Sequence, residues 1–165
     1  MDTLPAVLRT GLNDIDEQHA HLLRWADALV KDDPDAPPEE RKRAFVFLLF
    51  YTASHFAAEE DAMHTHGYPA IEAHCARHVA FRGQVAALRR EVEAHGLDQA
   101  AARRIYQLVV DWLPRHVAEY DTPLSLFLAR TRATLTPLPE VEDLLEDNEL
   151  PAWMERVIEG MERDG

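Results

Sequence analysis

Five histidines and two carboxylates recur in four segments of this chain, each of which has the length and character of a helix. The seven residues are His19, His55, Glu59, His74, His78, His116 and Asp121. Two pairs, His55/Glu59 and His74/His78, are spaced four residues apart, so the members of each pair lie one turn apart on the same face of a helix. Each pair thus presents two metal ligands in one direction. Seven ligands facing one interior are too many for one ion and suit two, and nitrogen with bridging carboxylate oxygen is a ligand set that fits iron.

The order of apolar runs, caps and breakers predicts an all-α protein, an up-down-up-down antiparallel four-helix bundle with a C-terminal helical extension. The predicted helices span about residues 13–31, 39–65, 69–94 and 98–121. Asn13 or Asp14 is expected to cap the first helix and Asp98 the fourth, because short polar side chains accept hydrogen bonds from the backbone of a first turn. Gly96 ends the third helix in the manner of a C-cap. Short connections between long helices make neighbouring helices antiparallel.

The fourth predicted helix is interrupted by two prolines. Pro114 removes a backbone donor to the carbonyl of Val110 and is expected to kink the helix. Thr122-Pro123 has the form of a new N-cap followed by the first helical position. The sequence therefore predicts that this helix breaks and restarts over residues 124–130.

Composition narrows the classes of protein that fit. A length of 165 residues suggests one domain, and the formal net charge of −13 argues against binding to nucleic acid or to an anionic membrane surface. The single cysteine, Cys75, excludes an internal disulfide framework. The N-terminus lacks the basic start and apolar run of a signal peptide, and the longest apolar stretch, residues 44–53, is too short to span a bilayer. A cytoplasmic location is the simplest expectation.

The C-terminal part of the sequence differs from the rest. We expect the bundle to occupy residues 1–133 and an acidic extension to occupy 134–165. From Glu140 onward the chain has ten acidic and two basic residues, which give this part a net charge of −8. Apolar residues recur in it at helical spacing, namely Trp153, Met154, Val157, Ile158 and Met161. Such a short helix is unstable alone, so it must dock on its own bundle, on a second copy, or on another protein partner.

The order and local sequence of the candidate ligands resemble the hemerythrin family, and specifically the bacterial hemerythrins. The resemblance covers roughly residues 10–130. It rests on Asp16-Glu17-Gln18-His19 with Leu22-Leu23, His55-Phe56-Ala57-Ala58-Glu59-Glu60, Gly67-Tyr68-Pro69, His74-x-x-x-His78, and Trp112-Leu113-x-x-His116-Val117-x-x-x-Asp121. His116 and Asp121 are five residues apart, so a regular helix would not pair them on one face, but the family shares this spacing.

The resemblance implies a non-haem, carboxylate-bridged di-iron centre that binds dioxygen reversibly and is not an enzyme. Glu59 and Asp121 would bridge two iron ions, Fe2+ or Fe3+, together with an oxo or hydroxo group. The five histidines would divide three to one iron and two to the other, which leaves one coordination position open. By the same resemblance, an apolar oxygen pocket is expected at Leu113, Trp112, Val117 and Phe56.

Several other interpretations remain open at this stage. His19 alone is more often a helix-surface or core histidine than a ligand, and each i,i+4 pair alone could be an ordinary surface pair. The chain lacks the Glu-x-x-His motif of ferritin-like di-iron proteins and the His-Glu-x-x-His motif of zinc hydrolases. The alternative functions are an oxygen-, redox- or iron-sensing module that acts through a protein partner, and a di-iron enzyme that handles peroxide or nitric oxide.

Overall fold

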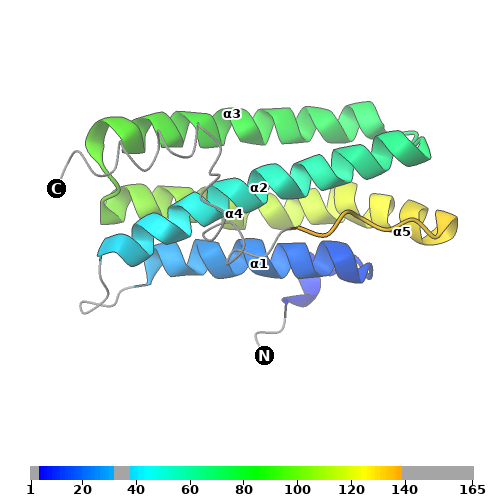
Figure 1. The fold of residues 1–165 in the computed structure, drawn as a ribbon, viewed down its shortest axis with the longest axis horizontal. Helices are drawn as coiled ribbons and strands as arrows, with labels where there is room; N and C mark the ends of the chain where they lie inside the picture. Colours follow the sequence, from blue (N-terminus) through cyan, green and yellow to red (C-terminus); the bar gives the residue numbers. More distant parts are fainter. Residues whose placement is uncertain (1–3, 32–37, 139–165) are drawn as a thin grey trace.

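The predicted four-helix bundle is confirmed. The computed structural model describes residues 4–31 and 38–138, in which four long helices lie side by side (Figure 1). They are α1 (Asn13–Val30), α2 (Pro38–His66), α3 (Ile71–His95) and α4 (Gln99–His116). A short 3-10 helix, η1 (Ala6–Leu8), precedes α1. After α4 come a π-helical turn, η2 (Val117–Asp121), and a further helix, α5 (Thr122–Thr131).

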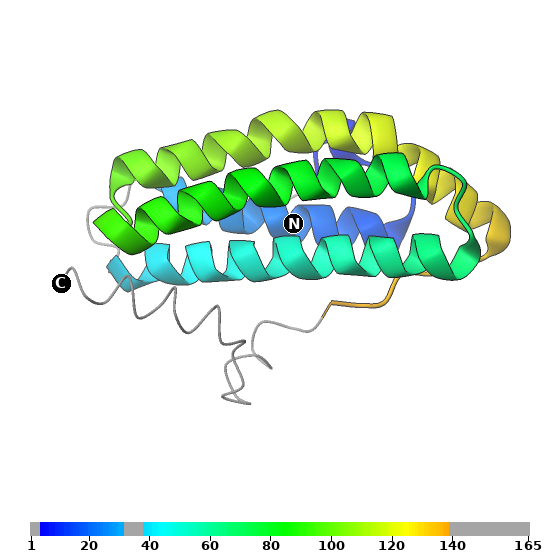
Figure 2. The ribbon, with the colours of Figure 1, turned by 90° about the horizontal axis from the view of Figure 1, so that it is seen from above.

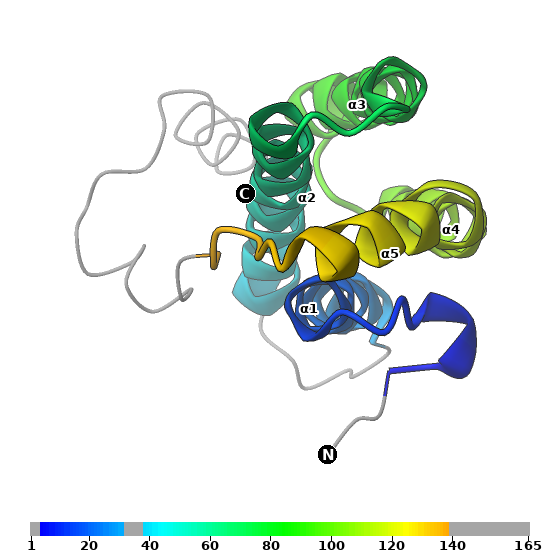
Figure 3. The ribbon, with the colours of Figure 1, turned by 90° about the vertical axis from the view of Figure 1, so that its right-hand side faces the viewer.

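The helices form a square in which each long helix packs on two others. Helix α1 packs on α2 and α4, and α3 packs on the same two helices. The view along the bundle in Figure 3 and the view from above in Figure 2 both show this arrangement. The tight connection between α2 and α3 contains Gly67, whose positive φ of 67° favours glycine. Neighbouring long helices are therefore antiparallel, as the short connections predicted.

A buried polar layer separates two apolar clusters in the bundle. Along α1, Ile15 belongs to one cluster and Leu22, Ala26 and Leu29 to the other, with His19 between them. Helix α2, which runs antiparallel to α1, has the reverse order: its residues before His55 pack in the cluster of Leu22, and its residues after Glu59 pack with Ile15. Burying a large apolar side chain contributes about 1.5–3 kcal/mol, so the clusters on both sides of the layer stabilise the scaffold that positions its polar side chains.

The predicted helix caps are confirmed at two helices and wrong at one: Gly96 is the C-cap of α3, with φ 80° and its N–H bonded to the carbonyl of Val92. Asp98 caps α4, and its carboxylate accepts a 2.7 Å hydrogen bond from the backbone N–H of Ala101. The predicted cap at Asn13 or Asp14 is wrong, because α1 begins after Leu12 without a side-chain cap. Instead, Asp16 lies within the first turn and accepts hydrogen bonds from both the N–H and the hydroxyl of Thr10. This carboxylate holds the N-terminal arm against α1.

The restart predicted after Thr122-Pro123 is confirmed as a separate helix, α5, but the predicted break before it is wrong. Thr122 has φ −62° and ψ −48°, which are helical values, and the chain passes from α4 through η2 into α5 without leaving helical conformation. Helix α4 includes Pro114 and continues to His116. A proline is tolerated in the first turn of a helix, and Pro123 lies in the first turn of α5. The signal that predicted a break thus marks a change of helix type.

The chain that follows α5 packs on the bundle as far as the structure describes it. Arg132 ends α5 with φ 54°, and the buried Ala133 and Leu135 then join the cluster around Ile15. The backbone N–H of Leu135 also donates to Asp14. The amphipathic stretch around Trp153 lies outside the described residues. None of the helices in the described ranges has the length and apolar character needed to cross a membrane.

Candidate metal centre

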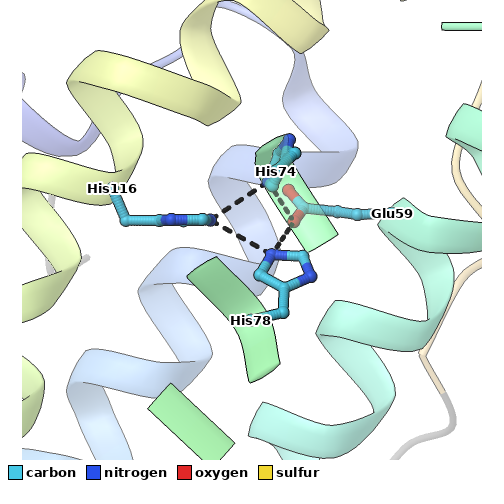
Figure 4. A group of neighbouring side chains, drawn as sticks. All are labelled: Glu59, His74, His78 and His116. Atoms are coloured by element: carbon cyan, nitrogen blue, oxygen red, sulfur yellow. Dashed lines mark hydrogen bonds and ion pairs between the residues drawn. The ribbon is translucent and has the colours of Figure 1, made fainter. Parts of the chain in front are cut away.

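The seven residues singled out in the sequence meet in the polar layer of the bundle. His116 is 3% exposed, and the other six are fully buried. They come from four different helical segments: His19 from α1, His55 and Glu59 from α2, His74 and His78 from α3, and His116 and Asp121 from α4 and η2. Four of them point toward one another in Figure 4.

Three histidines meet Glu59 in one group of potential ligands. The Nε2 atoms of His74 and His78 each lie 3.1 Å from Nε2 of His116. Oε2 of Glu59 lies 3.5 Å from Nε2 of His74 and 3.2 Å from Nε2 of His78. We call His74, His78 and His116 the three-histidine group. These four residues bring their ligand atoms close enough to hold one metal ion.

The other two histidines form a second group with both carboxylates. We call His19 and His55 the two-histidine group. Nε2 of His19 lies 3.1 Å from Oδ2 of Asp121, and Nε2 of His55 lies 3.7 Å from Oε1 of Glu59. These four residues also bring ligand atoms within reach of one ion.

Each carboxylate faces both groups. Glu59 directs Oε1 to His55 and Oε2 to two members of the three-histidine group. Asp121 directs Oδ2 to His19, while its Oδ1 lies 3.1 Å from Nε2 of His74 and 3.0 Å from Nε2 of His116. This is the arrangement that two carboxylates need in order to bridge two metal ions.

The π-helical turn explains how His116 and Asp121 come together. A π-helix closes its backbone hydrogen bonds between residues five apart, and π turns are frequent at functional sites. Residues 117–121 form such a turn, and it allows the Asp121 carboxylate to contact the His116 ring five residues earlier. A regular α-helix would have directed the two side chains to different faces.

The polar atoms of this layer are better placed to bind metal ions than to form hydrogen bonds with one another. Both carboxylate oxygens of Glu59 and both of Asp121 lack a hydrogen-bond partner of good geometry among the described residues. The Nε2 atoms of His19 and His55 also lack one there. Buried polar atoms without partners are costly, and buried carboxylates are normally paired or bound to metals. The donor set therefore fits two metal ions with nitrogen and oxygen preferences.

Burial and mutual repulsion shift the protonation of the metal-free site. Burial raises the pKa of Glu59 to about 7, and the nearby charge of Asp121 adds to this shift. Burial lowers the pKa of His74, but the adjacent carboxylates of Asp121 and Glu59 outweigh this effect and bring that pKa to about 9. Burial keeps the pKa of His55 and His78 well below the ordinary value, so both rings are neutral and able to bind a metal.

Three of the five histidines are oriented by hydrogen bonds at their outer nitrogen. Nδ1 of His19 lies 3.2 Å from the carbonyl oxygen of Leu8, and Nδ1 of His55 lies 2.8 Å from Oε1 of Gln18. Nδ1 of His78 lies 2.9 Å from Oε1 of Glu60. With Nδ1–H donating outward, Nε2 is left as the atom that binds a metal.

Gln18 and Glu60 are supporting residues that the sequence did not reveal. Both were visible as the polar neighbours of His19 and Glu59 in the segments that resemble the family. A residue one position from a ligand on a helix points about 100° away from it, so its contact with a histidine on another helix depends on how the helices pack. That packing could not be read from one sequence.

The residues expected to form an oxygen pocket are next to the metal centre but are divided between its two sides. Phe56 stacks on the His78 ring with centroids 3.9 Å apart, and Trp112 stacks on the His116 ring at 4.0 Å. Leu113 and Val117 are buried with Leu8 in a small apolar cluster, against which Trp112 also packs. Leu8 is the residue whose carbonyl faces His19, so this cluster lies toward the two-histidine group.

The remaining histidines and the cysteine do not join the metal centre. His64, His66 and His95 are exposed, and His21 stacks on Tyr51 with ring centroids 5.2 Å apart. Cys75 is partly buried, at the edge of the cluster around Ile15.

A water-accessible cavity of about 510 Å³ reaches the three-histidine group between α3 and α4. Its lining includes His116 and Trp112 together with the charged residues Arg77, Asp111, Arg115 and Glu119. The side of the centre formed by His116 is therefore closer to solvent than the other ligands are.

Comparisons with known proteins identify the family to which the chain is similar. A profile of the hemerythrin HHE cation binding domain matches residues 10–124. The chain is similar to a bacteriohemerythrin of Pseudomonas paraeruginosa (strain DSM 24068 / PA7), with 27% identity over 151 residues that make up 90% of each chain. It is also similar to a bacteriohemerythrin of Stenotrophomonas maltophilia (strain R551-3), with 27% identity over 69% of this chain and 72% of that protein. A myohemerythrin of Sipunculus nudus is 26% identical over 65% of this chain and 77% of its own. No solved structure matches the chain.

Proposed function

This chain belongs to the hemerythrin HHE cation-binding family, as its resemblance to the bacterial hemerythrins predicted, and on that basis we propose that it binds dioxygen reversibly as a carrier, store or delivery protein. Members of this family bind non-haem iron and are typically oxygen-binding proteins that catalyse no reaction. The observation that supports the proposal most strongly is the pair of buried carboxylates, Glu59 and Asp121, each of which faces histidines of both groups.

The seven residues divide naturally between two ions. In this proposal the three-histidine group holds one iron, the two-histidine group holds the other, and Glu59 and Asp121 hold both. The unequal division leaves the ion at His19 and His55 with fewer protein ligands. Two ferrous ions held in this way would supply the electrons for reversible dioxygen binding.

The surrounding residues keep the ligands oriented and dry. The outer hydrogen bonds of His19, His55 and His78 fix the ring nitrogen that faces the centre. Leu113 and Val117, which are 2% and 1% exposed, exclude water from the side of the two-histidine group. A dry environment slows the loss of superoxide and the access of water, both of which would leave an inert diferric protein.

The visible spectrum of the reduced, iron-loaded protein tests this function. We expect a charge-transfer band to develop in air, to disappear when oxygen is removed under argon, and to return over repeated cycles. The Glu59→Ala protein is the matched negative control, and the Asp61→Ala protein, which changes an exposed neighbouring carboxylate, should behave as the parent does. Irreversible bleaching in the first cycle, or steady consumption of peroxide or nitric oxide with turnover, would replace oxygen carriage by one of the alternative functions.

A further inference from the structure

A groove with an apolar floor runs between α2 and α3 on the surface of the bundle. It has a volume of about 230 Å³ and is lined by Leu49, Thr52, Ala53, Arg82, Val85, Ala86 and Arg89. The two arginines are the only charged residues in this lining. Its chemistry therefore suits a segment with an apolar stripe and negative charge.

Two other cavities of the bundle suit such a segment less well. The cavity between α3 and α4 has the carboxylates of Asp111 and Glu119 in its lining, which offset the charges of Arg77 and Arg115 there. A cavity of about 170 Å³ beside α1 is flanked by Asp14 and Glu17. Carboxylates at these positions repel an acidic segment, whereas no carboxylate lines the groove between α2 and α3.

The described chain ends beside α1 and α2. Pro137 and Leu138 line a small cavity together with residues of α1 and with Tyr51 of α2, and Leu138 packs against both main apolar clusters. Figure 3 shows the segment after α5 reaching the side of the bundle occupied by α2, away from α4. The residues that follow Leu138 therefore start from the helix that forms one wall of the groove.

The rest of the chain has the required charge and pattern. From Glu140 to the C-terminus it carries a net charge of −8, and its apolar stripe begins at Trp153. Fourteen residues separate Leu138 from Trp153, enough to span up to about 46 Å when extended. Helix α2 with its 29 residues is about 44 Å long, so the whole groove is within reach.

We propose that the acidic C-terminal segment, residues 140–165, docks in the groove between α2 and α3 of its own chain. Its apolar stripe covers Leu49, Ala53 and Val85, and its carboxylates face the two arginines. Arg82 already donates to Glu60, and Arg89 pairs with Glu93, but these side chains are still 39% and 31% exposed. A guanidinium group has five N–H donors, so each arginine can bind a second carboxylate.

Docking at this place connects the C-terminal segment to the metal centre. Arg82 donates a 2.8 Å hydrogen bond to Oε1 of Glu60, the same oxygen that accepts from Nδ1 of His78. The Arg82 guanidinium also lies 5.3 Å from the centre of the Phe56 ring, which stacks on His78. A segment that holds Arg82 in place would also hold the His78 ring in place, through Glu60 and Phe56. The importance of this link for the metal centre rests on the proposed function, but the docking itself does not rest on it.

Cross-linking in the full-length protein tests the docking. In a Cys75→Ala background, Ala86→Cys and Ile158→Cys place one thiol in the groove and one in the apolar stripe, to be joined by a short bismaleimide. The matched control combines Ile158→Cys with Gln84→Cys, which lies on the same helix but lines the cavity on the side toward α4. We expect an intramolecular cross-link, identified by peptide mass spectrometry, at several-fold higher yield for the Ala86 pair.

Charge removal provides a second arm of the test. Arg89→Gln should lower the cross-link yield several-fold and make the C-terminal segment more sensitive to protease, whereas Arg90→Gln, at an exposed position on α3, should change neither. Equal yields for the Ala86 and Gln84 pairs would overturn the proposal, as would cross-links found only between two copies. Neither readout requires iron, so failure of the docking and failure of the proposed oxygen binding can be told apart.

Discussion

The two histidine groups of the metal centre are supported in different ways. In the two-histidine group, both outer nitrogens bond to neutral acceptors, the Leu8 carbonyl and the Gln18 amide. In the three-histidine group, His78 bonds to the charged Glu60, while the outer nitrogens of His74 and His116 have no hydrogen-bond partner among the described residues. The first group is closed off by Leu8, Leu113 and Val117, and the second borders a large cavity.

This difference suggests a division of tasks between the two groups. Three imidazoles, one of them strengthened by a carboxylate, bind an ion firmly, because a charge-assisted hydrogen bond makes the imidazole a better ligand. Two imidazoles in a dry apolar environment leave room for a further ligand. We therefore expect changes near His78 to act mainly on metal retention and changes near His19 to act mainly on oxygen chemistry.

Removal of a shared carboxylate should have the strongest effect, because it damages both groups at once. For Glu59→Ala we expect the iron content after dialysis to fall from two ions per chain to one or fewer, measured by elemental analysis. The control is Asp61→Ala, an exposed carboxylate two residues away, which should retain the parent content. Two ions retained by the Glu59→Ala protein would mean that this residue does not bridge them.

Substitution of the residues that bond to the outer histidine nitrogens, Glu60 and Gln18, tests the difference between the two groups directly. Loss of such a partner typically lowers metal affinity about 10–100-fold, so Glu60→Ala should weaken retention of one ion by that amount. Gln18→Ala should have a smaller effect, since its bond to His55 involves a neutral acceptor. Rates of iron transfer to a chelator give both values under the same conditions. Equal effects of the two substitutions would remove the distinction drawn between the groups.

Each group contains one histidine, His19 or His74, whose pKa is raised by Asp121. The pH dependence of metal binding therefore tests a property that the two groups share. Burial lowers the pKa of His19 and His74, but the adjacent carboxylate of Asp121 outweighs this effect and raises the pKa of both, for His74 to about 9. Glu59 is protonated below about pH 7. Because metal binding must displace these protons, affinity should fall by about tenfold per pH unit between pH 9 and 7, and more steeply below pH 7.

Anaerobic competition titrations with ferrous iron and a chromophoric chelator would measure this dependence. The sign follows from the bound form, in which Glu59 is ionised and His74 is neutral, so acid favours the metal-free protein. An affinity that stays constant from pH 9 to pH 6 would show that neither group carries its proton in the metal-free state.

The sequence was sufficient to predict the fold and the meeting of the seven polar residues. It was insufficient to predict the hydrogen bonds from other residues that orient them. Residues four apart on a helix share a face whatever the helix packs against, so His55/Glu59 and His74/His78 could be paired in advance. The π turn that pairs His116 with Asp121 is not indicated by local spacing, and Thr122-Pro123 was read as a break because the same residues also fit a change of helix type. The contacts of Gln18 and Glu60 also join separate helices, which local spacing does not reveal.

The smallest predicted effect concerns the dry side of the two-histidine group. Leu113 is 2% exposed and packs with Leu8 and Val117, so Leu113→Asn would place an amide among apolar side chains and draw in water. We expect the oxygenated protein to autoxidise several-fold faster, while iron content remains unchanged because no proposed ligand is altered. Decay of the charge-transfer band in air, followed alongside iron analysis, measures both quantities.

A second substitution separates oxygen chemistry from ordinary core packing. Val109→Asn buries an amide at a similarly buried position of α4, but in the apolar cluster that lies beyond the metal layer. Both variants should unfold at a lower temperature, since each buries an amide group that has no hydrogen-bond partner in place. Only Leu113→Asn should shorten the lifetime of the oxygenated form. If both variants autoxidise at the same rate, the residues around Leu113 serve packing alone, and the dry environment of the two-histidine group has no special part in retaining oxygen.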